Sequence, residues 1–166
     1  MTGQPLYRPL AAADYPDALF LCKELVGTIA VPDGDAGAAR FSVVLQHSGT
    51  TVWGAQVNDH IASMATLHIL PNMTYSARPY CLVENVVTLR ALQGRELARG
   101  VMDSVRQAAW AAGAYKIMLL TGKSLGAKGF YEKLGFSDDQ KYGMMIRRAP
   151  ARQPNRSGAT SSTQPP

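Results

Sequence analysis

Cysteine is scarce in this sequence, with only Cys22 and Cys81, which lie far apart and outside any Cys-x-x-Cys pair. Such spacing supports neither a zinc site nor a disulfide framework, so the expected compartment is the reducing cytoplasm. No apolar run approaches the roughly 20 residues of a membrane-spanning helix. The N-terminus also lacks a charged-then-apolar secretion signal. We therefore expect a cytoplasmic protein with no metal site and no membrane partner.

Charge is also sparse, since charged residues make up 17% of the 166 residues, although the net charge is +5. Several cations gather near the C-terminus, at Arg147, Arg148, Arg152 and Arg156. The remaining cations are spread out and do not alternate with aromatic residues, as they do in proteins that stack single-stranded bases. This pattern argues against a nucleic-acid partner and favours a small anionic ligand.

The length suits one domain, which we expect over residues 1–148. Residues 149–166 are rich in Pro, Ser, Thr and Arg and are expected to form a disordered tail. For the first third, the sequence predicts a strand at 6–10, a helix from the N-cap Asp14 to Val26 ended by Gly27, and a loop at 31–37. Residues 38–46 fit either a helix or a strand, and the helix is favoured.

From residue 50 the pattern predicts strands first and then alternating helices and strands. The expected strands cover 51–57, 61–70, 80–88, 115–121 (buried) and 141–147, with a loop at 72–78. The turn residues Asn58-Asp59 predict a hairpin between the first two. The expected helices cover 94–112 and 124–134, and Gly113 and Gly135 follow their ends.

Three segments carry the functional signal: Glu84–Thr88 on a strand, Gln93–Arg99 at a helix start, and Phe130–Phe136 at a helix end. In this order they resemble the GNAT superfamily of acyl-CoA-dependent N-acyltransferases, and within it most resemble the glucosamine-phosphate N-acetyltransferase branch. The resemblance implies an α/β (α+β) fold with a mixed, mostly antiparallel sheet flanked by helices. It also implies acetyl-CoA as cosubstrate, an amine acceptor and, for that branch, a homodimer.

The second segment fits a phosphate-binding turn. Unpaired N–H groups at a helix start, together with the helix dipole, favour a pyrophosphate. The family pattern maps onto Gln93, Gly94, Arg95, Glu96, Leu97 and Ala98, and Arg99 adds positive charge. Glu96 departs from the pattern, which has glycine there. Either Glu96 adopts a helical conformation and points to solvent or pairs with Arg95 or Arg99, or the cofactor site is impaired.

Glu84 is the candidate general base. An amine attacks a thioester only as the neutral species, so a group must accept its proton, and a strand carboxylate can do this. Alternatively, Glu84 pairs with Arg78 or Arg90 and only stabilises the sheet. The resemblance further implies that the backbone of Val86, Val87 and Thr88 pairs with pantetheine, with the Val87 N–H stabilising the oxyanion.

Tyr131 occupies the position of the family's general acid, which would protonate the leaving thiolate. The alternative is that Tyr131 only packs against Phe130 and Phe136. Ser124 stands where the family often has an asparagine that contacts CoA, and a serine hydroxyl reaches less far.

The sequence leaves the acceptor amine open. A phosphosugar would need convergent cations, for which Arg40, Arg78 and Arg90 are possible suppliers. Other small primary amines, amino sugars, an antibiotic amine or a protein lysine also fit. The predicted function is acetyl transfer from acetyl-CoA to a primary amine of a small molecule. The alternatives are a catalytically weak or inactive CoA-binding or regulatory module and a basic nucleic-acid binder.

Overall fold

A computed structural model describes residues 4–26 and 31–148 of the chain. The chain divides into two compact units, Met1–Leu120 and Thr121–Pro166. The helix stop expected at Gly27 and the disordered tail expected from Ala149 lie outside the described residues.

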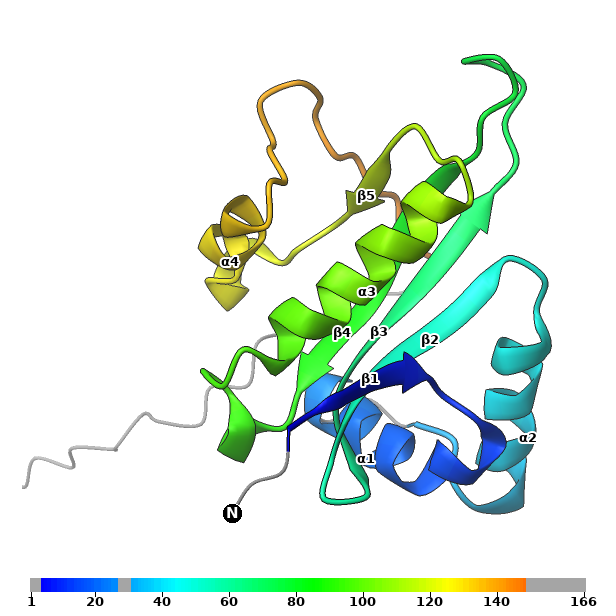
Figure 1. Ribbon diagram of the computed structural model, residues 1–166, viewed down its shortest axis with the longest axis vertical. Helices are drawn as coiled ribbons and strands as arrows, with labels where there is room; N and C mark the ends of the chain where they lie inside the picture. The colour runs from blue at the N-terminus through cyan, green and yellow to red at the C-terminus, as the bar shows by residue number, and fades with distance from the viewer. Residues whose placement is uncertain (1–3, 27–30, 149–166) are drawn as a thin grey trace, which may run out of the picture. The chain divides into compact units, whose positions relative to one another are not determined.

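The first unit is built around a five-stranded sheet with the order β1-β2-β3-β4-β5 (Figure 1). Its strands are β1 (Leu6–Pro9), β2 (Thr50–Val57), β3 (His60–Leu70), β4 (Tyr80–Thr88) and β5 (Ile117–Leu119). Neighbouring strands are antiparallel except β4 and β5, which are parallel. Helix α3 (Leu97–Ala111) connects this parallel pair, as a parallel crossover requires. The mixed, mostly antiparallel sheet predicted from the sequence is confirmed.

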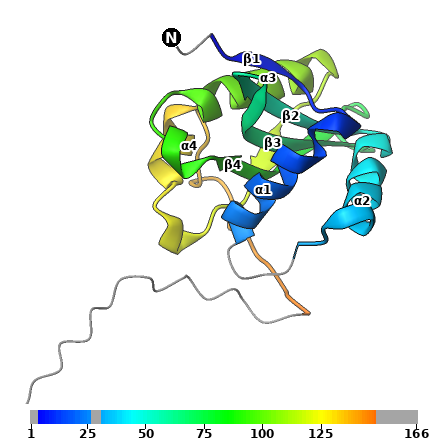
Figure 2. The same ribbon diagram turned by 90° about the horizontal axis from the view of Figure 1, so that it is seen from below.

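Helices cover both faces of this sheet, with α3 on one face and α1 (Tyr15–Val26) and α2 (Gly34–Gln46) on the other (Figure 2). The face of α3 that packs on the strands consists of Leu97, Val101, Met102, Val105 and Ala109, all buried. On the opposite side, Leu21 of α1 is fully buried among Val52, Ile61 and Met64. Helices α3 and α1 therefore each bury one apolar stripe, as a helix on a sheet surface must.

The hairpin between β2 and β3 forms at the predicted turn. Asn58 and Asp59 have φ values of 49° and 65°, the left-handed pair that a tight two-residue hairpin turn needs. The expected strand at 80–88 matches β4 in full, whereas β5 is shorter than its predicted range of 115–121. The residues of β5 are half-buried instead of buried, because β5 is the edge strand of this sheet.

Helix α2 begins at Gly34, inside the segment for which the sequence predicts a loop. Asp33 stands at its N-cap, and Asp35 in the first turn interacts favourably with the helix dipole. A Cβ at Gly37 would lie 2.3 Å from the backbone carbonyl oxygen of Pro32 and 1.9 Å from the Tyr15 hydroxyl oxygen, so glycine is required there. The loop prediction therefore holds for residues 31–33 and is wrong from Gly34 onward, where these Gly and Asp residues begin a helix. The helical interpretation of residues 38–46 is confirmed.

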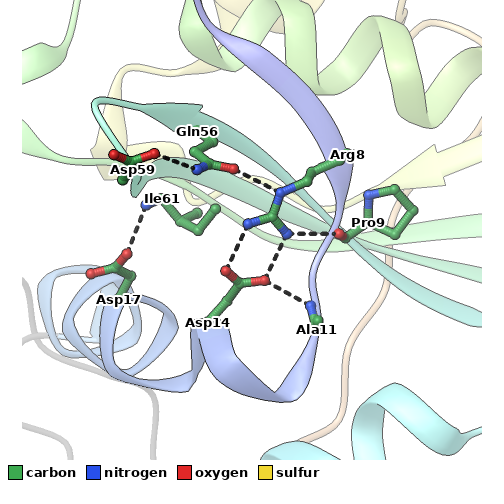
Figure 3. Close-up of polar contacts among 8 residues, drawn as sticks. All are labelled: Arg8, Pro9, Ala11, Asp14, Asp17, Gln56, Asp59 and Ile61. Carbon is green, nitrogen blue, oxygen red and sulfur yellow. Dashed lines mark hydrogen bonds and ion pairs between the residues drawn. The ribbon is translucent and has the colours of Figure 1, made fainter.

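A polar network joins β1 to α1 and to the β2–β3 hairpin (Figure 3). Arg8 donates from Nη1 and Nη2 to the two carboxylate oxygens of Asp14, at 2.8 Å each, and from Nε to Gln56 Oε1 at 2.8 Å. Asp14 also accepts the Ala11 N–H at 2.7 Å. Asp14 is the last residue of the 3-10 turn Ala12–Asp14, which precedes α1. Its carboxylate accepts the N–H of the residue before that turn, so Asp14 is not the N-cap of α1 that the sequence predicts.

The second unit contains a 3-10 turn, Lys123–Leu125, and the short helix α4 (Lys128–Lys133). The continuous helix expected at 124–134 is interrupted at Gly126, which has a left-handed φ of 66°. Residues 141–147 form no strand in the described part of this unit, and the side chains of Tyr142, Met144 and Ile146 are exposed. That strand prediction is wrong here because an alternating apolar pattern forms a strand only where another strand bonds to it.

Candidate active site

The candidate site begins with an irregularity in β4. Between the pairs Thr66↔Glu84 and Met64↔Val87, β3 advances by two residues while β4 advances by three. Asn85, with a left-handed φ of 54°, takes up the extra residue. This is a β-bulge, which bends a strand and redirects its side chains. The strand pattern of residues 80–88 does not predict this bulge, although asparagine is one of the few non-glycine residues that tolerates a left-handed conformation.

The second feature of the site is an open edge on β4. The parallel pairing with β5 covers Cys81, Leu82 and Val83 and ends there. Beyond it, from Glu84 to Thr88, β4 bonds to β3 on one side but no longer to β5 on the other. On that edge the Thr88 carbonyl oxygen accepts a hydrogen bond from Gln93 Nε2 at 3.4 Å. Unpaired main-chain groups on a strand edge can bond an extended ligand.

The ladder between β3 and β4 decides which amides face that edge. Leu89 donates its N–H to Ala62 O at 2.9 Å, and bonded and non-bonded pairs alternate along an antiparallel ladder. Thr88 and Ser63 therefore form a non-bonded pair, consistent with the 2.7 Å contact of their hydroxyls. The N–H of Val87 then faces β3, and that of Thr88 faces the open edge. This disagrees with the expectation that Val87 supplies the oxyanion donor.

Glu84 lies at the point where β4 leaves β5, with its side chain half-buried. Arg78 instead donates to the carbonyl oxygens of Gly113 and Ala114, at 3.1 and 3.2 Å. Arg90 lies beyond the far end of β4, where its backbone N–H donates to Glu24. Over residues 4–26 and 31–148, Glu84 forms no ion pair. The alternative of a purely structural Arg–Glu84 pair therefore finds no support.

The turn before α3 differs from the expectation at one residue. Helix α3 begins at Leu97, and Glu96 stands at its N-cap with φ 60° and ψ 8°. The helical conformation expected for Glu96 is therefore wrong. A non-glycine residue loses about 1–2 kcal/mol in this left-handed region, whereas glycine enters it freely. The expectation that the Glu96 side chain points to solvent or pairs with an arginine is confirmed, since its carboxylate is 71% exposed and pairs with Arg99.

The remainder of this turn fits an anionic ligand. The N–H groups of Leu97, Ala98 and Arg99 precede the first bond of the helix, from the Gly100 N–H to Glu96 O. Such donors lack partners within a helix and point outward. Gly94 has a φ of 77° and no atom within 4 Å of where a Cβ would stand. A pyrophosphate such as that of CoA can therefore approach the backbone closely.

Tyr131 and Ser124 belong to the second unit. The Tyr131 ring meets Phe130 at 5.1 Å and Phe136 at 6.1 Å between centroids, both edge to face. This is the aromatic packing of the alternative interpretation, and it holds the half-buried phenol in a fixed orientation. Ser124 lies in the exposed 3-10 turn.

Other reactive groups are less suited to catalysis. Burial raises the pKa values of the Cys22 and Cys81 thiols, which disfavours the nucleophilic thiolate. Among the described residues, no three His, Cys, Asp or Glu side chains gather as a metal site would require. Nor is any helix in that part of the chain long and apolar enough to cross a membrane.

Comparisons with known proteins agree with this architecture. Residues 14–136 match the model of the acetyltransferase (GNAT) family. A candidate acetyltransferase from Agrobacterium tumefaciens strain C58 is 38% identical, with a TM-score of 0.82 over 86% of this chain and 99% of that chain. The search of curated proteins found no significant match.

Two more distant structures share the fold. Glucosamine-6-phosphate N-acetyltransferase from Arabidopsis thaliana is 20% identical, with a TM-score of 0.77 over 89% of this chain and 100% of that chain. The aminoglycoside N-acetyltransferase AAC(6')-Iy, in complex with CoA, is 17% identical, with a TM-score of 0.73 over 88% of this chain and 96% of that chain.

Proposed function

The chain belongs to the acetyltransferase (GNAT) family, and on that basis we propose that it transfers an acetyl group from acetyl-CoA to a primary amine of a small molecule. The amine nitrogen attacks the thioester carbonyl, the new N–C bond forms, and the C–S bond breaks to release CoA. The observation that carries this proposal is that β4 separates from β5 at Glu84, next to the bulge at Asn85. An open strand edge and a carboxylate thus lie together.

In this proposal, Glu84 accepts the proton that the substrate ammonium must lose, directly or through one water. The absence of an ion-pair partner among the described residues leaves its carboxylate available. The backbone of Val86, Val87 and Thr88 pairs with pantetheine, and the outward N–H of Thr88 replaces that of Val87 as the oxyanion donor.

The cofactor's phosphates bind at the turn before α3, through the first-turn amides and the positive charge of Arg95 and Arg99. Residues proposed to form this part are Gln93, Gly94, Arg95, Glu96, Leu97, Ala98 and Arg99, with Ser124 as a further contact. Tyr131 protonates the CoA thiolate, and solvent returns its proton. The cytoplasmic location and the homodimer remain proposals, and sedimentation of the purified chain tests the dimer.

A second candidate function is a CoA-binding module with weak or no catalysis. The observation that favours it is Glu96, which holds a carboxylate and its partner Arg99 at the turn where phosphate would bind. It predicts acetyl-CoA binding without turnover.

The test is release of CoA thiol over a panel of primary amines, with glucosamine phosphate included because of the branch resemblance. We expect turnover with at least one amine. Glu84→Gln should lower kcat by about 10²-fold or more, and Tyr131→Phe should lower it by about tenfold or more, because each removes a proton-transfer group. Glu132→Gln, an exposed carboxylate paired with Lys128, is the matched control and should leave kcat unchanged. Tight acetyl-CoA binding with no turnover on any amine would favour the binding module.

A further inference from the structure

The side chains that share a sheet face with Glu84 identify the chemistry around the acceptor. Residues directly opposite each other in neighbouring strands point to the same face. Glu84 lies opposite Thr66, and Leu82 lies between His68 and Met118. Val52, opposite Thr66, packs against α1 in the core. Leu82, Glu84 and Met118 therefore share the sheet face on which α1 and α2 pack.

The helices leave the β5 end of this face open within the first unit. Helix α1 packs mainly on β3 and β4, and α2 packs on β2, while neither makes extensive contact with β5. Leu82 and Met118 are half-buried, and Leu120, just beyond β5, is 53% exposed. The side chains of this face nearest to the Glu84 carboxylate, Leu82, Met118 and Leu120, are thus apolar, whereas Tyr80 and Lys116 lie further along the same face.

The cations suggested for a phosphosugar do not converge on this face. Arg78 and Arg90 flank opposite ends of β4, whose nine residues span roughly 30 Å. Arg78 is held by the carbonyl oxygens of Gly113 and Ala114, and Arg40 lies on α2, which packs on β2. Lys116, two residues before Met118, does lie on this face, but its Nζ stands over the rings of Tyr80 and Tyr115, at 5.6 and 5.4 Å, beside the start of β4 and away from Glu84. Among residues 4–26 and 31–120, no Lys or Arg is paired with Leu82 or Glu84 across the sheet.

We infer that the acceptor is a primary amine carried on an apolar body, such as an aralkylamine, and not a phosphorylated amino sugar. This inference rests on the proposed function. The ammonium complements the Glu84 carboxylate, and the apolar body covers Leu82 and Met118, which gains free energy in proportion to the apolar area removed from water. A phosphate placed over Leu82 and Met118 would lose its hydration, while the cation on this face, Lys116, is held over two aromatic rings at the start of β4.

The test uses the full chain with two probes, 2-phenylethylamine and glucosamine 6-phosphate. We expect kcat/KM for 2-phenylethylamine to exceed that for glucosamine 6-phosphate by at least about tenfold, since burying an apolar group changes specificity by this order. Calorimetric binding of each amine in the presence of CoA gives a second readout that does not depend on turnover.

Introducing a positive charge next to Leu82 tests whether the apolar character of this face selects the amine. Met118→Lys places a cation beside Leu82, and we expect it to lower kcat/KM for 2-phenylethylamine and raise that for glucosamine 6-phosphate, each by about tenfold. Met73→Lys makes the same change at a loop residue that is 92% exposed, and it should alter neither value. If Met118→Lys does not fold, Met118→Gln removes the same apolar contact without a charge and should still lower kcat/KM for 2-phenylethylamine.

The outcomes separate this inference from the proposed function. A preference for glucosamine 6-phosphate would overturn the inference while supporting acetyl transfer. Binding of 2-phenylethylamine without turnover of any amine would support the apolar face and count against acetyl transfer. If 2-phenylethylamine is neither bound nor acetylated, the inference is overturned.

Discussion

At the scale of single residues, Glu96 has the largest consequence for the cofactor site. Its backbone adopts the left-handed conformation that glycine favours, and its carboxylate pairs with Arg99. The carboxylate opposes phosphate binding in two ways, because it places a negative charge beside the helix start and because it engages the guanidinium of Arg99. The family match covers this turn, so we expect the site to bind CoA but more weakly than a glycine-containing turn would.

Glu96→Gly should therefore bind CoA more tightly, by about tenfold, which corresponds to about 1.4 kcal/mol. It should also raise the free energy of unfolding by about 1 kcal/mol, because glycine enters the left-handed region without strain. Calorimetry measures the first effect and urea unfolding the second.

Glu96→Gln separates the two causes, since it removes the charge but keeps a side chain at positive φ. We expect this variant to bind CoA more tightly with no gain in stability. Weaker CoA binding by both variants would show instead that the carboxylate itself contacts the cofactor.

At the scale of elements, the Arg8–Asp14 pair holds β1 against the start of α1 (Figure 3). The bonds from the Arg8 guanidinium hold the pKa of Asp14 below its ordinary value. The folded protein therefore protonates Asp14 less readily than the unfolded chain does. This carboxylate stabilises the fold at pH values above the unfolded pKa of about 3.9, and the contribution is lost as the pH falls through the lower folded pKa.

We expect Asp14→Asn to lower the free energy of unfolding by about 1–2 kcal/mol at pH 7, since it removes a charge-assisted pair that is only partly exposed. The difference from the unsubstituted chain should shrink progressively below about pH 4. Urea unfolding at several pH values measures both. The control is Asp59→Asn, whose exposed contact to Gln56 is long, at 3.4 Å; a loss as large as that of Asp14→Asn would contradict this account.

Elements with their own turn chemistry or apolar pattern were predictable from the sequence. The hairpin at Asn58-Asp59 and the nine residues of β4 match their predicted bounds closely. Elements that depend on contacts outside their own segment were not predictable from the sequence. The first turns of α2 include Gly37, where Tyr15 and the Pro32 carbonyl leave no room for a Cβ, and residues 141–147 have a strand-like pattern but no strand bonded to them in the described second unit.

At the scale of the whole molecule, the net charge of +5 has a kinetic consequence. A positively charged protein attracts an anionic cosubstrate over long range, and salt screens that attraction. An apolar amine, with its single positive charge, gains nothing from it.

We expect KM for acetyl-CoA to rise several-fold between about 50 and 500 mM salt, because the Debye length shrinks over this range. KM for the amine should not rise in parallel. Steady-state kinetics at fixed pH measures both. Retention on DNA that weakens steeply with salt would instead support the nucleic-acid alternative.

The sequence by itself determined the family-level architecture and the main candidate groups, because turn chemistry, strand alternation and the order of the three segments are local properties of the chain. Only the tertiary structure decided that Glu84 stands where β4 leaves β5, that the Val87 N–H faces β3, and that Arg78 and Arg90 lie at opposite ends of one strand. It also decided that Glu96 is left-handed. These facts depend on strand register and on backbone torsion, which are set by contacts between residues far apart in the sequence.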